Sequence, residues 1–461
     1  MQYQQYEERD LLMGKKKTDT IVSTSKKKIK RTTPFIFFTH QFDDIDKRVA
    51  KRHITILILL SILAKFIVAF VTTTVFHSFL DLFDISVYFQ HALMPLQGQL
   101  PFTSDFQYPI LILIPMTIAL VPALLLQNGM AFVYTFQFLM VLCDITTIVC
   151  IYLIGLKLWN EQTAFHAGLI YAGAFSAAYF VITKYDAFPA TLLMLAILFT
   201  VYRHEVKGYV ALVLGFFTKV FPILALPFFV LYNAKNTSLK QEIISAVKVV
   251  IPISAVLFLP LFFISPDTFR IYIPVRSELG YYSNTLTFTI YSWVHDVFNL
   301  GISLDVISAI MYIVMGVGLL ILLYAAFTIP GRDPKLLIRL ILCATILVVV
   351  CAKVRSPQYI VWFTPMICLL AADNIRKIVL LYIFQALAYL EFPLMFGSFY
   401  TALQYTDTAL SSGWMITLVV FTLEYLALFV CLWSVVNPRE IYDKIRQASG
   451  KSSSPQRASG N

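Results

Sequence analysis

The sequence predicts an all-α polytopic membrane protein with about twelve transmembrane helices, because apolar stretches fill most of the chain. Hydrophobic residues make up 59% of the 461 residues, the mean hydropathy is +0.75, and only 13% of the residues are charged. Soluble domains carry about 25% charged residues. Apolar runs that can cross a hydrocarbon core of about 30 Å recur from Ile54 almost to the C-terminus. The alternating short segments of an outer-membrane barrel are absent from the sequence.

The charge pattern indicates membrane topology and gives no reason to expect a nucleic-acid partner. The net charge is +10, but Lys and Arg gather in the two tails and in short loops. Cytosolic segments of membrane proteins carry such residues because these resist translocation. The 6 cysteines lie in or beside apolar runs without a Cys-x-x-Cys pair, so we expect neither a disulfide nor a cysteine metal site.

Residues 1–53 are predicted to form a disordered basic tail in the cytosol. They contain lysine triplets at 15–17 and 26–28 and few large apolar residues. Contact of this tail with anionic lipid is the alternative. The first predicted span, residues 54–76, therefore leads outward.

Residues 77–129 then form the predicted first external loop. Its second half, residues 109–127, is apolar but is interrupted by Pro115 and Pro122, which remove helix hydrogen bonds and kink the chain. We expect short interfacial helices here and no membrane crossing.

The later spans follow from placing the cationic loops on alternating sides. Residues 208–232 are too short for two full helices and carry Lys219 near the middle, which predicts two broken helices that meet at Lys219. Residues 265–300 are predicted to form a long external loop, and residues 438–461 a cytosolic tail. The transmembrane domain covers residues 54–437, with later spans at 130–156, 163–183, 187–202, 243–264, 302–327, 336–351, 359–372, 378–396 and 414–436.

Charged residues on the predicted external side indicate a functional site. Acidic and basic residues are mixed there and lie at the ends of spans. This favours an anionic ligand held by Lys and Arg, with a carboxylate left for proton transfer. For any one residue alone, a solvated loop charge is the alternative. The residues are Asp81, Asp84, Asp105, Lys184, Asp186, Lys219, Arg270, Arg276, Glu278, Lys353 and Arg355.

Two of these cations precede the predicted span 359–372. Lys353 and Arg355 are followed by Pro357, a residue suited to a first helical turn. Cations beside the free N–H groups of a helix start predict a phosphate-binding site. An anchor on lipid headgroups is the alternative. The carboxylates inside spans, Asp144, Glu391 and Glu424, are assigned to packing against other helices and not to catalysis.

Several motifs resemble those of C-type (GT-C) membrane glycosyltransferases, which use polyprenyl-phosphate sugars. The resemblance in the first external loop rests on Asp84-Ile-Ser-Val-Tyr88, Gly98-Gln-Leu-Pro101-Phe102, Asp105 and Tyr108-Pro109. Ile110 departs from the pattern, because many members have a second proline there. Later landmarks are similar to the mannosyltransferase branch of bacteria and archaea, namely Lys184-Tyr-Asp186-Ala-Phe-Pro189, Lys219-Val-Phe-Pro222 and Arg355-Ser-Pro-Gln-Tyr359-Ile-Val-Trp362.

The resemblance implies a GT-C-like fold and an inverting transfer at the non-cytoplasmic face. A hexose, mannose by family, moves from a polyprenyl- or dolichyl-phosphate sugar to a hydroxyl of a lipid-linked glycan or glycolipid. The reaction needs a base for the acceptor proton and cations for the departing phosphate.

Each of these roles has candidate residues in the sequence. Asp84 is the expected base, and Asp105 is the second candidate. Asp81 and Asp186 orient the acceptor or bind a divalent cation, and no other cofactor is implied. Tyrosines on the outer side contact the sugar or belong to an interfacial aromatic belt. The expected phosphate ligands are Arg355, Lys353, Lys219, Arg276 and Lys184, and the expected sugar contacts are Tyr88, Tyr281, Tyr282 and Tyr359.

Two rival functions fit the same charges. A transporter or flippase of lipid-linked sugars would place its binding groups near the midplane and show repeated halves, neither of which the sequence indicates. A ligase that transfers a glycan from a polyprenyl-diphosphate carrier shares the same external chemistry. The plasma membrane of a prokaryote is favoured over the endoplasmic reticulum. The sugar, its linkage and the acceptor stay open at this point.

Overall fold

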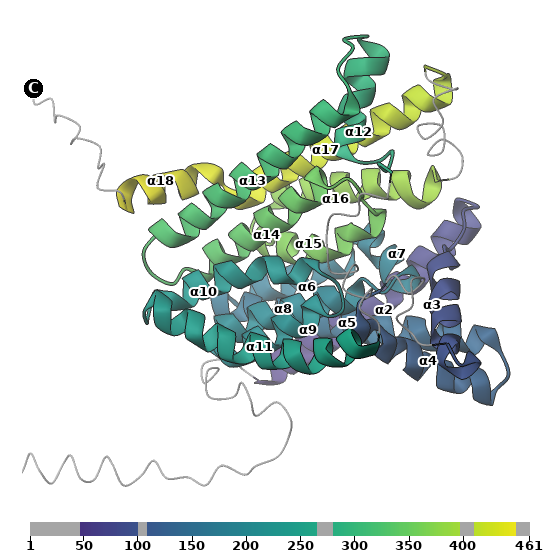
Figure 1. The fold of residues 1–461 in the computed structure, drawn as a ribbon, viewed down its shortest axis with the longest axis horizontal. Coiled ribbons are helices and arrows are strands. Elements are labelled where there is room, and N and C mark those ends of the chain that lie inside the picture. Colours follow the sequence, from purple (N-terminus) through teal and green to yellow (C-terminus); the bar gives the residue numbers. More distant parts are fainter. Residues whose placement is uncertain (1–46, 100–107, 265–279, 397–409, 449–461) are drawn as a thin grey trace, which may run out of the picture. The chain divides into compact units, whose positions relative to one another are not determined.

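The protein is built from helices, and no strand occurs in residues 47–99, 108–264, 280–396 and 410–448, which the computed structural model describes (Figure 1). Seven of these helices are long and apolar enough to cross a membrane. The all-α polytopic prediction is therefore confirmed. Residues 52–461 form one compact unit, and all contacts below lie within it. The long helices are α2 (Lys47–Phe70), α5 (Gly129–Leu158), α11 (Leu239–Ile264), α13 (Leu304–Thr328), α14 (Pro334–Cys351), α16 (Ile375–Tyr389) and α17 (Ser412–Val436). The π-helical turns Val71–Val75 and Leu390–Leu394 continue α2 and α16, which reach the length of a crossing with these turns included.

The predicted spans at residues 187–202 and 359–372 correspond to apolar helices shorter than a full crossing. α8 (Ala187–Val201) and α15 (Ile360–Ala371) are buried along most of their length. α8 packs against α5, α15 and α9 (Glu205–Phe216). A helix of 15 residues such as α8 is only about 22 Å long. α8 is therefore shorter than the hydrocarbon core. The helices that pack around it shield it from lipid.

The predicted break at Lys219 is confirmed. α9 ends at Phe216, and the chain resumes as a 3₁₀ turn, Phe221–Ala225, followed by α10 (Leu226–Ala234). Lys219 lies in the connecting turn. The turn is tight at Gly215, where an added Cβ would lie 3.0 Å from the Cβ of Pro222.

The predicted span at residues 163–183 corresponds to a bent pair of helices. α6 (Glu161–Ala172) and α7 (Phe175–Thr183) meet at 60°. The side-chain oxygen of Gln385 accepts hydrogen bonds from the amides of Ser176 at 3.1 Å and Ala177 at 3.3 Å. A distant residue therefore satisfies N–H groups that the bend leaves without helical partners.

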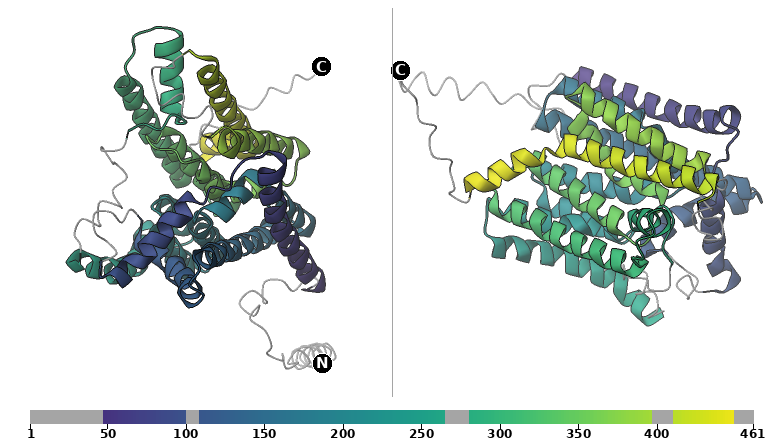
Figure 2. Two further views of the ribbon diagram at one scale, coloured as in Figure 1. Left: turned by 90° about the vertical axis from the view of Figure 1, so that its right-hand side faces the viewer. Right: turned by 90° about the horizontal axis from the view of Figure 1, so that it is seen from above.

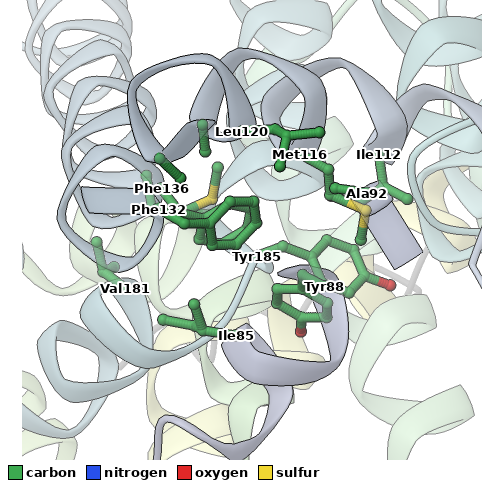
Figure 3. Close-up of a cluster of buried hydrophobic side chains, with 14 of the residues drawn as sticks. Ile85, Tyr88, Ala92, Ile112, Met116, Leu120, Phe132, Phe136, Val181 and Tyr185 are labelled. Atoms are coloured by element: carbon green, nitrogen blue, oxygen red, sulfur yellow. The ribbon is translucent and has the colours of Figure 1, made fainter. Parts of the chain in front are cut away.

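The first external loop folds into helices, as the sequence predicts. α3 (Phe83–Leu93) and α4 (Leu113–Leu125) lie side by side against the first half of α5 (Figure 1). Figure 3 shows their shared core, in which Met116 and Leu120 of α4 meet Phe132 and Phe136 of α5. Because the core partners of α4 on α5 belong to that first half, α4 packs beside one end of the long helices.

Two sets of loops identify the two ends of the transmembrane helices. The first set contains Asp81, Lys184, Asp186 and Lys219, and we call it the Asp186 end. Backbone hydrogen bonds join its loops, including Leu111 to Phe217 at 3.0 Å and Tyr282 to Lys353 at 3.3 Å. Segments far apart in sequence, including the first external loop, therefore meet there.

The other set, the Lys157 end, is the cationic one. Lys157 lies 5.6 Å from the ring centroid of Tyr202, and Arg332 pairs with Glu205 at 3.1 Å. Lys235 caps the end of α10, and Lys335 and Lys377 lie in the first turns of α14 and α16 at this same end. This grouping of the loops agrees with the inside and outside positions that the sequence predicts for them. The sequence prediction assigns the cationic end to the cytosol.

Segments predicted to be loop or tail contain helices. Residues 265–300 include α12 (Leu286–Tyr291) and the following π-helical turn Ser292–Val297. The helix of α2 begins at Lys47, inside the predicted N-terminal tail. In the C-terminal tail, α18 (Pro438–Ala448) continues beyond α17, which itself lies along α16 (Figure 2). α18 is docked by ion pairs of Glu440 with Arg339 at 2.8 Å and of Lys444 with Asp333 at 2.9 Å.

A buried ion pair joins the first span to the bundle. The ammonium of Lys65 on α2 lies 2.5 Å from a carboxylate oxygen of Asp144 on α5. Ser61 donates to the same oxygen at 2.7 Å, and Tyr171 of α6 donates to the other oxygen at 2.8 Å. The assignment of Asp144 to pairing between helices is correct, and its main partner is a lysine that the sequence analysis overlooked.

We predict that removing Asp144 alone destabilises the protein more than removing the whole pair. Asp144→Leu leaves the Lys65 charge buried without its counter-ion, which costs roughly 3–5 kcal/mol. Lys65→Met combined with Asp144→Leu is expected to recover most of this loss. Thermal unfolding of the purified variants in detergent measures both effects, and a double variant no more stable than Asp144→Leu would contradict the prediction.

Candidate active site

A carboxylate pair held by one lysine lies at the Asp186 end. The Lys184 ammonium lies 2.5 Å from an oxygen of Asp81 and 2.8 Å from an oxygen of Asp84. Lys184 follows α7 directly, and Asp84 lies in the first turn of α3. The lysine is 5% exposed, whereas the side chains of Asp81 and Asp84 are 14% and 26% exposed. The structure thus unites three predicted site residues, with Asp84 the most accessible.

Local structure fixes Asp81 in this pair. Its second carboxylate oxygen accepts a hydrogen bond from the amide of Phe83 at 3.1 Å, so it supports the start of α3. The Tyr179 hydroxyl bridges the backbone around it, accepting from the Asp81 amide and donating to the Phe79 carbonyl, both at 3.0 Å. Asp81 is therefore the positioned member of the pair, and Asp84 keeps more freedom.

A second ion pair is formed by Asp186 and Lys219. One oxygen of Asp186 accepts from Lys219 at 2.6 Å and from the indole of Trp362 at 2.5 Å. Within the described part of the chain, the other oxygen of this fully buried side chain has no hydrogen-bond partner. The break between α9 and α10 is what brings Lys219 to this carboxylate.

Aromatic rings surround the Lys219 ammonium. It lies 4.7 Å from the ring centroid of Tyr185 and 5.0 Å from those of Tyr359 and Trp362. Trp362 is sandwiched between Tyr359 at 3.9 Å and Phe221 at 4.0 Å. Ring faces attract a cation by about 0.5–2 kcal/mol each. The rings and Asp186 together therefore hold the ammonium in place.

A tyrosine cluster connects the two ion pairs. Tyr88, Tyr108 and Tyr185 pack edge to face, with centroids 5.3–5.7 Å apart. Burial, and then the charges of Asp84 and Asp186, raise the pKa of the Tyr108 hydroxyl. Tyr185 stands in the chain between Lys184 and Asp186 and lies 4.7 Å from the Lys219 ammonium, so the cluster adjoins both ion pairs.

Tyr88, a predicted sugar contact, lies in the core beneath the site. Its side chain is fully buried beside Tyr185 (Figure 3). Burial, followed by the charge of Asp84, raises the pKa of its hydroxyl. Tyr108 and Trp362 were missed as individual site residues, although both stand inside the recognised motifs.

Arg355 lies in a separate buried network. Its guanidinium pairs with Glu391 at 3.1 Å and with Glu424, and it donates to the carbonyl of Asn284 at 3.1 Å. Asn284 in turn donates to Glu391 at 2.7 Å. The assignment of both glutamates to packing agrees with this geometry, but their partner is the residue predicted to bind phosphate. A phosphate would have to compete with two carboxylates for Arg355.

The other predicted residues are placed as follows. Lys353 lies over the ring of Tyr281 at 5.2 Å, so these two meet. Tyr281 also donates to Ser308 at 2.6 Å, and Tyr282 is 37% exposed. Asp105 and Arg276 lie outside the described residues. In the part of the chain that is described, no three His, Cys, Asp or Glu side chains form a metal-binding group.

Comparison with known proteins identifies no family for this chain. No protein-family model and no curated protein matches it. Among solved structures, it is similar to ArnT from Cupriavidus metallidurans in the apo state, with 14% identity and a TM-score of 0.44. The match covers 87% of this chain and 76% of ArnT. A likeness of that size assigns neither a substrate nor a site residue to this protein.

Proposed function

We propose that this protein is a membrane glycosyltransferase that moves a hexose from a polyprenyl-phosphate sugar to a hydroxyl acceptor. The observation that carries the proposal is the pairing of two carboxylates with Lys184 beside the Asp186–Lys219 pair. A hydroxyl nucleophile needs a base, and a departing phosphate needs a cation. Both kinds of group lie at the same end of a set of membrane helices.

We assign the base to Asp84. In an inverting displacement, the acceptor oxygen attacks the anomeric carbon while the bond from that carbon to the phosphate oxygen breaks. The acceptor proton passes to Asp84, and the bonding electron pair leaves with the phosphate. Asp84 is preferred over Asp81 because its side chain is more exposed and Asp81 also supports the start of α3. Asp105 remains the second candidate from the sequence.

We assign the donor phosphate to Lys219. An ammonium has three N–H donors, and Asp186 accepts one of them. The ring of Tyr359, half-buried and stacked on Trp362, lies directly beside this cation and is the ring we propose to contact the sugar. Lys184 and Lys353 are further cations at the same end, and Asp186 holds Lys219 in position.

The proposed site faces away from the cytosol. The Lys157 end gathers the cationic loops, so the positive-inside rule assigns that end to the cytosol and the Asp186 end to the other side. From the sequence we further propose that the protein lies in the plasma membrane of a prokaryote. The sequence motifs favour mannose as the sugar and a glycan or glycolipid as the acceptor.

The proposal is tested with purified full-length protein in lipid nanodiscs. Polyprenyl-phosphate mannose is supplied with extracted glycolipid acceptors, and a polyprenyl-diphosphate glycan is supplied in parallel. Mannose transfer supports the proposal, and glycan transfer would identify a ligase. The same protein is also reconstituted in sealed vesicles, where movement of the lipid-linked sugar between leaflets without transfer would identify a flippase.

Asp84→Asn is predicted to abolish turnover, because the amide cannot take the acceptor proton. Loss of a general base lowers the rate by about 10²–10⁴-fold. Donor binding is expected to stay near the wild-type level. Asp305→Asn, at an exposed carboxylate in the first turn of α13, is the matched control. Retained turnover in Asp84→Asn would remove this residue from the mechanism.

Lys219→Met is predicted to raise KM for the donor by about tenfold or more, through loss of a charge-assisted hydrogen bond to phosphate. The KM of the acceptor should not change. Lys219→Met alone leaves the Asp186 carboxylate buried without its counter-ion, which also lowers stability. The double variant Lys219→Met with Asp186→Asn removes both charges, so a rise in donor KM that persists in it reports donor binding and not stability. An acceptor-only defect in a stably folded variant would contradict the assignment.

Arg355→Ala is predicted to act through stability and not through donor affinity. It leaves Glu391 and Glu424 buried without their cation, at a cost of roughly 3–5 kcal/mol. Glu424→Gln in the same background should restore part of the melting temperature, because it removes one uncompensated charge. A large rise in donor KM without a change in melting temperature would instead favour a phosphate-binding Arg355.

A further inference from the structure

An apolar groove of about 560 Å³ runs between α10 and α13. On α10 its residues run from the first turn toward Lys235, which follows the last residue of the helix, and on α13 they lie in the last turns. We call it the α10–α13 groove. Its lining residues are Leu226, Pro227, Val230 and Leu231 of α10 and Leu323, Tyr324 and Phe327 of α13.

The groove ends at a cation. The ammonium of Lys235 donates to the carbonyl of Phe327, a groove residue, at 2.6 Å. A smaller pocket next to it is lined by residues that include Tyr232, Lys235 and Asp333. Lys235 is paired with no carboxylate in the described part of the chain, since Asp333 is engaged by Lys444 at 2.9 Å.

The surroundings favour an anion beside Lys235. Burial lowers the pKa of this ammonium, and a neighbouring negative charge would offset that effect. The Lys157 end, to which Lys235 belongs, is the cationic end of the protein. Basic pockets between helices on the cytosolic side are suited to anionic headgroups.

We propose that the α10–α13 groove binds one diacyl phospholipid with an anionic headgroup. One acyl chain lies along the apolar groove, and the headgroup phosphate contacts Lys235. A groove that is apolar along its length and cationic at the membrane surface matches the two parts of such a lipid. The polyprenyl donor is the weaker occupant, because its phosphate is proposed to react at the opposite end of the helices.

The headgroup part is tested by native mass spectrometry of full-length protein delipidated in neutral detergent. Phosphatidylglycerol and phosphatidylcholine with identical chains are titrated separately. Wild-type protein is expected to retain one phosphatidylglycerol about fivefold more tightly. Lys235→Gln should lose this preference and still bind both lipids. An unchanged preference in Lys235→Gln, or no preference in the wild type, would overturn the proposal.

The chain part is tested by filling the groove. Val230→Trp should abolish tight retention of both lipids, whereas Val314→Trp, at an exposed valine on a face of α13 turned away from the groove residues, should behave as wild type. If Val230→Trp lowers the melting temperature, Leu231→Gln provides a second variant with weakened retention. Undiminished retention in a folded groove variant contradicts the proposal. Displacement of phosphatidylglycerol by inorganic phosphate would reveal a simple anion site, and displacement by polyprenyl phosphate would reveal a donor site.

Discussion

The Asp186 end depends on the two ion pairs that the buried Lys184 ammonium forms with Asp81 and Asp84. The ammonium lies within 2.8 Å of two carboxylates that the first external loop contributes, while it is itself carried at the end of α7. A charge removed from water is tolerated only when it is paired and hydrogen-bonded. The pairing therefore ties the loop to the transmembrane helices and sets where Asp84 can meet an acceptor.

The break between α9 and α10 brings a second cation, Lys219, to the same site. A continuous helix would have carried Lys219 along its surface, whereas the turn presents the ammonium to Asp186 and to three aromatic rings. Irregular backbone at such a depth is tolerated where protein surrounds it. The backbone is thus irregular at the place where the proposed chemistry needs a cation.

Two further buried charge networks hold helices together and are separate from this site. Lys65 and Asp144 join α2 to α5, and Arg355 joins the loop before α15 to Glu391 and Glu424. All are charge pairs in apolar surroundings, but the Lys184 and Lys219 pairs meet at the segment Lys184-Tyr185-Asp186, where Tyr185 of the tyrosine cluster lies beside Lys219. The location of a buried pair, and not its existence, distinguishes a candidate active site from a structural clamp.

The sequence by itself determined the helical membrane fold, the positions of most spans and the break at Lys219. It could do so because hydropathy, proline placement and the distribution of Lys and Arg are local properties of the sequence. These properties determine which segments enter the bilayer and on which side their loops lie. It also placed Asp81, Asp84, Lys184, Asp186 and Lys219 on one side of the membrane, among eleven charged residues predicted there.

Only the tertiary structure decided which charges meet. The sequence could not show that Lys184 serves two aspartates, that Gln385 supports the bend before α7, or that Arg355 is occupied by two glutamates. Each of these contacts joins residues more than thirty positions apart. Such pairings depend on how helices pack against one another, and hydropathy carries no information about which side chain faces which neighbour.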